Sequence, residues 1–177
     1  MKPSFSPLRR QLLLGHLAAA AIVAHVLEST LPGFGPFFKV GLANAFTLIA
    51  WAELGFPAAA AVSLIRVFAG SLFLGTFLSP TFFLSLSGAL GALAALALFS
   101  PPLFRLGPVG LSLMMALAHM AAQTTAAWGL IFHHTGIFLM LPWLLLGAWA
   151  AGLLNGLVSK LILDHMDRLR PILEGEL

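Results

Sequence analysis

A small set of polar side chains within apolar segments could do chemistry in this chain. Arg66 is flanked by Ile65 and Val67, near the middle of a long apolar run. A charge at such a position is energetically costly, so it marks a hypothesis for a functional site. Two interpretations fit it: a structural charge neutralised by helix carbonyls or by a carboxylate such as Glu28, or a cavity residue that holds an anionic ligand.

His119 and Gln123 form a second polar group. They are four residues apart, so they share one face if this segment is helical, and Thr124 follows Gln123 directly. The pair fits a ligand site, and it fits equally a hydrogen-bond network between helices. For Asn155, in the last apolar run, we expect a packing hydrogen bond.

The third polar group flanks a segment rich in glycine and proline. Glu28 precedes this segment, and Lys39 and Asn44 follow it. A loop of glycine and proline between a carboxylate and an ammonium group fits a lid over a ligand site, and the alternative is an interfacial turn with a surface ion pair. The candidate ligand-binding residues are therefore Glu28, Lys39, Asn44, Arg66, His119 and Gln123.

The sequence lacks the motifs of the common catalytic, metal and nucleotide sites. It has no cysteine, no HExxH or HxxxH pair, no GxxxxGK[ST] loop and no GxSxG turn. Both aspartates, Asp164 and Asp167, lie in the polar C-terminal segment, and one pair cannot form the two aspartate-rich motifs that hold Mg²⁺ against a diphosphate. We expect no catalytic activity, no cofactor and no metal.

The elements that must position these side chains are membrane helices. Hydrophobic residues make up 60% of the 177 residues and charged residues 8%, whereas soluble domains carry about 25% charged residues. So few charges cannot cover a water-exposed surface, and the apolar excess must face lipid. The length suits a single domain over residues 1–177. The basic residues do not cluster with aromatic ones, so we expect no nucleic-acid partner.

Proline and glycine divide the apolar sequence into segments close to the roughly 20 residues that cross a bilayer as a helix. The sequence therefore predicts an all-α integral membrane protein, a bundle of six transmembrane helices. The polar tail should continue the last helix as far as Pro171. The predicted spans are 11–31, 40–54, 56–77, 81–100, 108–132 and 136–163.

Basic residues predict the orientation of the bundle, because they accumulate in cytoplasmic segments. With both termini in the cytoplasm, only Lys39 among the basic residues outside the spans is external. The expected location is the cell membrane, as a multi-pass protein; the alternative for the first apolar run is a signal peptide cleaved near Ala24. The inner residues are then Lys2, Arg9, Arg10, Arg105, Lys160, Arg168 and Arg170.

Small residues recur at helical spacing in two of the predicted helices, and such stripes let helices approach closely in lipid. Gly152 and Gly156 lie in the last one. For these stripes we expect packing within the bundle, and the alternative for the first helix is a docking face for another membrane subunit. The small residues of the first helix are Gly15, Ala19, Ala20 and Ala24.

Several motifs between residues 27 and 162 carry a resemblance to a known family. They are Leu27-Glu28 with Leu31-Pro32, Lys39-Val-Gly-Leu-Ala-Asn44, Arg66 with Gly70 and Gly75, Ser85-Leu-Ser-Gly88, and Ala118-His119 with Gln123. On these motifs the chain resembles the heptaprenyl diphosphate synthase component I family, also labelled the Gx transporter family. Where that family usually has Asn after the histidine and Gly before the glutamine, this chain has Met120 and Ala122.

That family resembles in turn the substrate-binding S-components of energy-coupling-factor transporters. The resemblance implies six helices, an outward-facing pocket closed by the first outer loop, and docking through the first helix to a coupling subunit driven by two ATPases. The leading hypothesis is thus a binding and transport subunit for a small, anionic molecule. The alternatives are a non-catalytic accessory subunit of polyprenyl diphosphate or quinone biosynthesis, working with a soluble prenyltransferase subunit, and a structural subunit of a membrane redox complex.

Overall fold

The computed structural model describes residues 6–30, 41–100, 104 and 106–174, and this part of the chain is almost entirely helical, with no β-strand. A π-helix, Trp128–Phe132, and a 3-10 helix, Thr135–Met140, connect the last two α-helices. The α-helices are α1 (Pro7–Thr30), α2 (Leu42–Leu54), α3 (Phe56–Phe73), α4 (Pro80–Phe99), α5 (Pro108–Ala127) and α6 (Leu141–Glu174).

Four helical segments in the described part are long and apolar enough to cross a membrane, as expected of a multi-pass membrane protein. They are α1, α3, α4 and the segment 135–169 that includes most of α6. The α2 helix has 13 residues, a rise of about 20 Å against a hydrocarbon core of about 30 Å. The α5 helix has 20 residues but carries polar side chains and is not among the four.

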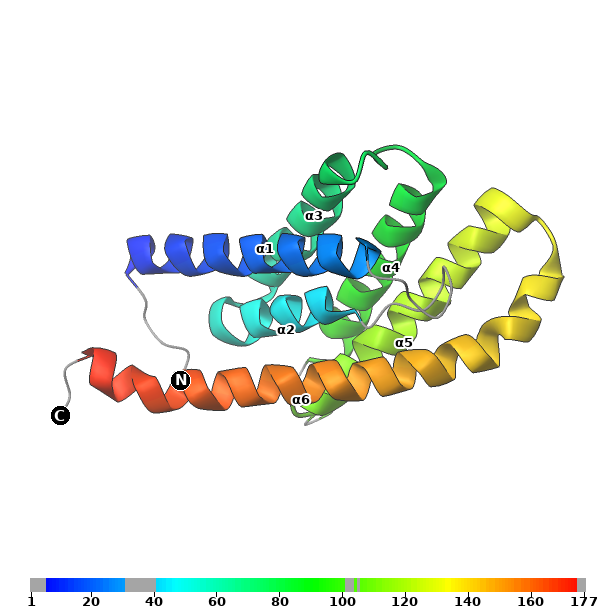
Figure 1. The fold of residues 1–177 in the computed structure, drawn as a ribbon. Helices are drawn as coiled ribbons and strands as arrows, with labels where there is room; N and C mark the ends of the chain where they lie inside the picture. Colours follow the sequence, from blue (N-terminus) through cyan, green and yellow to red (C-terminus); the bar gives the residue numbers. More distant parts are fainter. Residues whose placement is uncertain (1–5, 31–40, 101–103, 105, 175–177) are drawn as a thin grey trace.

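The helices run back and forth so that α1 begins, and α6 ends, at the same end of the molecule (Figure 1). Leu17 of α1 and Leu163 of α6 belong there to one core cluster, which also contains α2 residues and has Met166 at its edge. The α6 helix continues to Glu174 and thus does not stop at Pro171. Pro171 lacks a backbone N–H and so removes one hydrogen bond of the helix, only three residues before its end.

The short α2 helix is the centre of the bundle. It packs against α1, α3, α5 and α6, and most of its residues are buried. Residues on several of its faces enter two core clusters, with Ile49 in one and Leu48 in the other. Because protein encloses α2, the helix does not need to match the thickness of the bilayer.

Proline and glycine lie at the starts of α3, α4 and α5, where the sequence predicts breaks between helices. Gly55 alone joins α2 to α3, with φ 93° and ψ 178°, a conformation open almost only to glycine. Pro57, Pro80 and Pro108 each lie in the first turn of a helix, where the missing amide costs nothing. The α3 helix ends at Phe73, four residues before the predicted end of its span, and Gly75 has a positive φ of 66° shortly after.

The glycines of α6 pack against α5, which confirms the packing interpretation for this pair of helices. A Cβ on Gly156 would lie 2.7 Å from Val109 Cα, and one on Gly152 would lie 3.0 Å from Leu113 Cα. Ser112 Oγ also donates a 2.8 Å hydrogen bond to the Gly152 carbonyl. Close approach of the two helices therefore requires small residues here.

The small residues of α1 have a different environment. A Cβ on Gly15 would meet nothing within 4 Å, and Gly15 and Ala19 are both exposed. Ala20 and Ala24 are half-buried. Docking of another subunit on this face stays a prediction.

Candidate functional site

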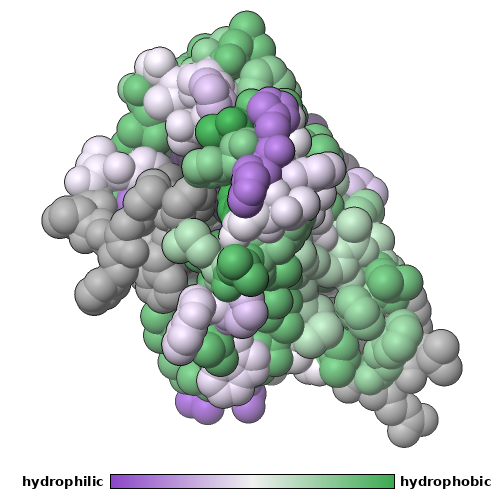
Figure 2. Space-filling model, turned by 90° about the vertical axis from the view of Figure 1, so that its right-hand side faces the viewer, coloured by the Kyte–Doolittle hydropathy of each residue, from purple (hydrophilic) through white to green (hydrophobic). Residues whose placement is uncertain are grey.

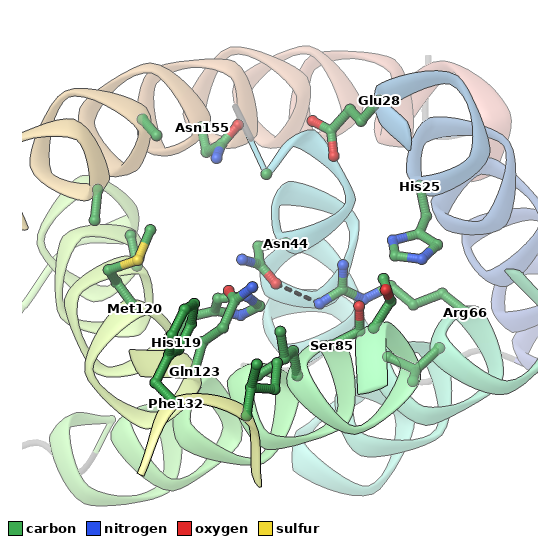
Figure 3. Close-up of a pocket in the computed structure, with 18 residues that line it drawn as sticks. His25, Glu28, Asn44, Arg66, Ser85, His119, Met120, Gln123, Phe132 and Asn155 are labelled. Atoms are coloured by element: carbon green, nitrogen blue, oxygen red, sulfur yellow. Dashed lines mark hydrogen bonds between the residues drawn. The ribbon is translucent and has the colours of Figure 1, made fainter. Parts of the chain in front are cut away.

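Side chains from all six α-helices and the π-helix line one cavity of about 410 Å³, the central cavity (Figure 3). It lies at the N-terminal end of α2, where Gly41 and Asn44 contribute to its wall. Small-molecule sites typically measure about 300–1,000 Å³, so the volume suits a small ligand. Its polar lining residues are His25, Glu28, Asn44, Arg66, Thr81, Ser85, His119, Gln123 and Asn155.

Five of the six candidate ligand-binding residues lie in the wall of this cavity: Glu28, Asn44, Arg66, His119 and Gln123. They come from α1, α2, α3 and α5, so only the packed bundle brings them together. The sixth candidate, Lys39, lies outside the described residues. Their placement makes contact with a ligand possible, and ligand binding stays a prediction.

Arg66 is buried, with 4% of its surface exposed, and its guanidinium reaches the cavity wall. Its Nη2 donates a 2.6 Å hydrogen bond to Asn44 Oδ1, whereas its Nε has no hydrogen-bond partner among the described residues. The Glu28 carboxylate is close enough to interact electrostatically with the guanidinium. Both sequence-based interpretations of Arg66 therefore apply in part: the charge has a carboxylate near it, and it also lines a cavity.

Glu28 links the end of α1 to the start of α2. Its Oε1 accepts a 2.5 Å hydrogen bond from the backbone N–H of Leu42, the first residue of α2. The preceding Gly41 has φ 74°, which suits glycine at this turn. Because the N-terminus of a helix carries a partial positive charge, α2 compensates part of the carboxylate charge. The proposed lid over the cavity, in residues 31–40, lies outside the described residues.

His25 is a cavity residue that the sequence-based reasoning missed. It precedes Glu28 by three residues, and this spacing on one helix face could have indicated it. A glycine on the neighbouring helix makes room for each cavity histidine: a Cβ on Gly70 would lie 2.5 Å from the His25 ring, and one on Gly88 would overlap the ring of His119.

Asn155 and Ser85 also line the central cavity, although the sequence favoured a packing role for Asn155 and gave no role to Ser85. Asn155 is fully buried on α6, and its Nδ2 lies near Gly41, since a Cβ on Gly41 would be 3.4 Å from it. Within the described ranges, no group of three His, Asp or Glu residues could hold a metal ion. The cavity wall is thus suited to hydrogen bonding and charge recognition.

A family profile matches the part of the chain that forms this cavity. The profile of the heptaprenyl diphosphate synthase component I family matches residues 17–162, a range that includes every cavity-lining residue named above. None of the curated proteins or solved structures compared with the chain is significantly similar to it. The family match covers well over half of the sequence, and the chain belongs to the heptaprenyl diphosphate synthase component I family.

Proposed function

We propose that this chain is a membrane-embedded binding subunit for a small anionic molecule, which it helps to transport. The observation that carries the proposal is the buried guanidinium of Arg66 in the wall of the central cavity. Arginine stays charged in any protein environment, and its fork of donors matches carboxylate and phosphate groups. Its hydrogen-bond acceptor, the Asn44 amide oxygen, is neutral, so an anionic ligand would add a charged acceptor for the guanidinium.

The nearby carboxylate of Glu28 does not cancel this argument. Its oxygen is bound to the first amide of α2, and the positive end of that helix offsets part of its charge. The guanidinium therefore keeps a share of its attraction for an anion. The amides of Asn44, Gln123 and Asn155 could add neutral hydrogen bonds to the same ligand.

The proposal includes six membrane spans with both termini in the cytoplasm and the cavity toward the outside. Arg10 supports it, because its side chain donates a 3.5 Å hydrogen bond to the carbonyl of Leu54, at the C-terminal end of α2. The central cavity is at the opposite end of α2, so the basic end and the cavity lie on opposite sides. In this orientation α1 presents Gly15 and Ala19 to a coupling membrane subunit, as in the S-components of energy-coupling-factor transporters.

The test is the thermal unfolding of the purified full-length chain with a panel of vitamins, flavins and prenyl diphosphates. A ligand at one hundred times its Kd stabilises the folded state by about 2.7 kcal/mol, which raises the Tm. The increase in Tm should vanish in Arg66→Ala and persist in part in Arg66→Lys. It should be unchanged in Arg9→Ala, which removes an exposed arginine from the first turn of α1.

No Tm shift with any anion, together with unfolding of both Arg66 variants, would make Arg66 a structural charge and contradict the proposal. The second candidate would then take its place: a non-catalytic accessory subunit of polyprenyl diphosphate or quinone biosynthesis. The description of the family as a synthase component favours this candidate. It predicts stable co-purification with a soluble prenyltransferase subunit, and synthase activity that depends on both chains.

In both candidates we infer that the chain itself is not an enzyme. Its two aspartates lie on the last third of α6 and do not line the central cavity, and one pair cannot form a diphosphate–Mg²⁺ site alone. A structural subunit of a redox complex would need no cavity, and it would need no buried arginine N–H without a hydrogen-bond partner among the described residues, such as Arg66 Nε. The central cavity therefore argues against that third hypothesis.

A further inference from the structure

A second cavity, of about 240 Å³, lies between α5, the π-helix, the 3-10 helix and α6. Among the described residues, its wall contains no arginine and no carboxylate, unlike that of the central cavity. Most of its lining is apolar, and the side chains include Met120, Phe132, Ile137, Met140 and Leu144.

The two cavities are neighbours, because Met120, Gln123 and Phe132 line both of them. In Figure 3, Met120 and Phe132 lie on the side of the central cavity opposite to Arg66. Polarity therefore decreases from Arg66, past Gln123, toward the second cavity. A ligand that crossed this boundary would need a polar group at one end and an apolar group at the other.

The outer edge of the second cavity is apolar and exposed. Met140 lines the cavity and is 52% exposed, and its neighbours Leu139 and Trp143 are 81% and 76% exposed. Figure 2 shows this end of the molecule, where hydrophobic surface is interrupted by a strip of hydrophilic residues. In a bilayer such side chains face hydrocarbon, so the second cavity would be accessible to an apolar chain from the lipid.

Local backbone geometry holds the boundary residue Phe132 in place. It is the last residue of the π-helix, an element found often at functional sites, and the next residue, His133, has φ 47°. The His134 side chain then accepts a 2.9 Å hydrogen bond from Gly136 N–H and caps the 3-10 helix. The turn between α5 and α6 is thus built around the junction of the two cavities.

We propose that the two cavities together bind one single-tailed amphiphile, with its anionic head group at Arg66 and its hydrocarbon tail in the second cavity. The proposal rests on the proposed function, because it names the class of substrate for the same site. The head group binds by charge and hydrogen bonding, and the tail of a ligand that arrives from water binds by removal of its apolar surface from water.

Binding to the full-length chain in nanodiscs of neutral lipid tests this proposal with three probes. Geranyl diphosphate has both head and tail, inorganic pyrophosphate has only the head, and geraniol has only the tail. We expect pyrophosphate to bind at least about tenfold more weakly than geranyl diphosphate, because tail burial adds to affinity. Geraniol binding should not respond to Arg66→Ala, whereas binding of the two anions should be lost.

Two tryptophan substitutions on α6 form a matched pair. Leu144→Trp fills the second cavity, and Leu146→Trp places the same side chain on an exposed face that lines neither cavity. Leu144→Trp should abolish the advantage of geranyl diphosphate over pyrophosphate, and Leu146→Trp should preserve it. Ile137→Trp fills the same cavity from the 3-10 helix and replaces Leu144→Trp if that variant does not fold.

The outcomes separate this inference from the proposed function. Equal affinity for geranyl diphosphate and pyrophosphate, both lost in Arg66→Ala, would overturn the amphiphile and leave the anion-binding subunit standing. Loss of geranyl diphosphate binding in nanodiscs of anionic lipid would assign the site to a lipid head group, and would overturn the single-tailed ligand. Failure of every anion to bind in an Arg66-dependent manner would refute both proposals.

Discussion

Arg66 and the cavity histidines depend on neighbours contributed by other helices. Asn44, on α2, accepts the 2.6 Å hydrogen bond of Arg66 on α3, which orients the guanidinium along the cavity wall. His119 lies against Gly88 on α4, where any larger residue would occupy the space of its ring. At this scale, the glycines are as important to the site as the polar side chains, because they define where the rings can lie.

Gly88→Ala should change the central cavity without unfolding the protein. The new Cβ would overlap the outer atoms of the His119 ring, which can turn away, so we expect a loss of about 1–3 kcal/mol in unfolding free energy and weaker ligand binding. Thermal unfolding and ligand titration measure both effects. His119→Ala removes the overlap, so the two substitutions combined should cost less than the sum of the single ones; strict additivity would contradict the contact.

The α2 helix shows how a helix too short to cross a bilayer is accommodated. Its neighbours enclose it, Glu28 of α1 caps its first amide, and Gly55 turns the chain directly into α3. Its N-terminal end stops inside the bundle, and the central cavity occupies the space next to Gly41 and Asn44. The short length of this element is therefore linked to the presence of the cavity.

Gly55→Ala and Gly15→Ala should have opposite effects on stability. Gly55 has φ 93° and ψ 178°, which a side chain makes unfavourable by about 1–3 kcal/mol, so this variant should unfold at lower temperature. Gly15 lies in the interior of α1 with open space at its Cβ position, so alanine should stabilise the helix by up to about 1 kcal/mol. Thermal unfolding compares the two, and a Tm of Gly55→Ala equal to that of the wild type would show that the turn is not constrained.

The whole molecule has two distinct ends. One end holds the start of α1, the last turns of α6 and the exposed basic residues Arg9 and Arg168. The central cavity and the turn between α5 and α6 lie away from that end. In the proposed orientation, this separation would keep the basic residues on the cytoplasmic side and the central cavity on the other side.

Single cysteines can test the orientation, because the chain has none of its own. Thr135→Cys, exposed between α5 and α6, should react with a membrane-impermeant maleimide in intact cells. Ser6→Cys and Asp167→Cys, exposed near the two ends of the chain, should react only after permeabilisation. The reverse pattern would place the termini outside, and labelling at all three sites in intact cells would contradict a topology with both termini inside.

The sequence alone determined the helical membrane class, the family and most helix starts. Apolar content and the proline and glycine signals are properties of short segments, so Pro80 and Pro108 mark the starts of α4 and α5 without any tertiary information. The family resemblance is confirmed over residues 17–162. The end of α3 was less predictable, because apolar residues continue past Phe73 while the backbone already turns at Gly75.

Only the tertiary structure decided how the polar residues meet. Glu28, Asn44, Arg66 and His119 are far apart in sequence, and their common cavity follows from the packing of four different helices. The role of His25, the enclosure of α2 and the second cavity likewise depend on contacts between distant segments. Hydropathy and spacing report which side chains share a helix face, whereas a cavity is the space that remains after several faces have packed, and no single segment encodes it.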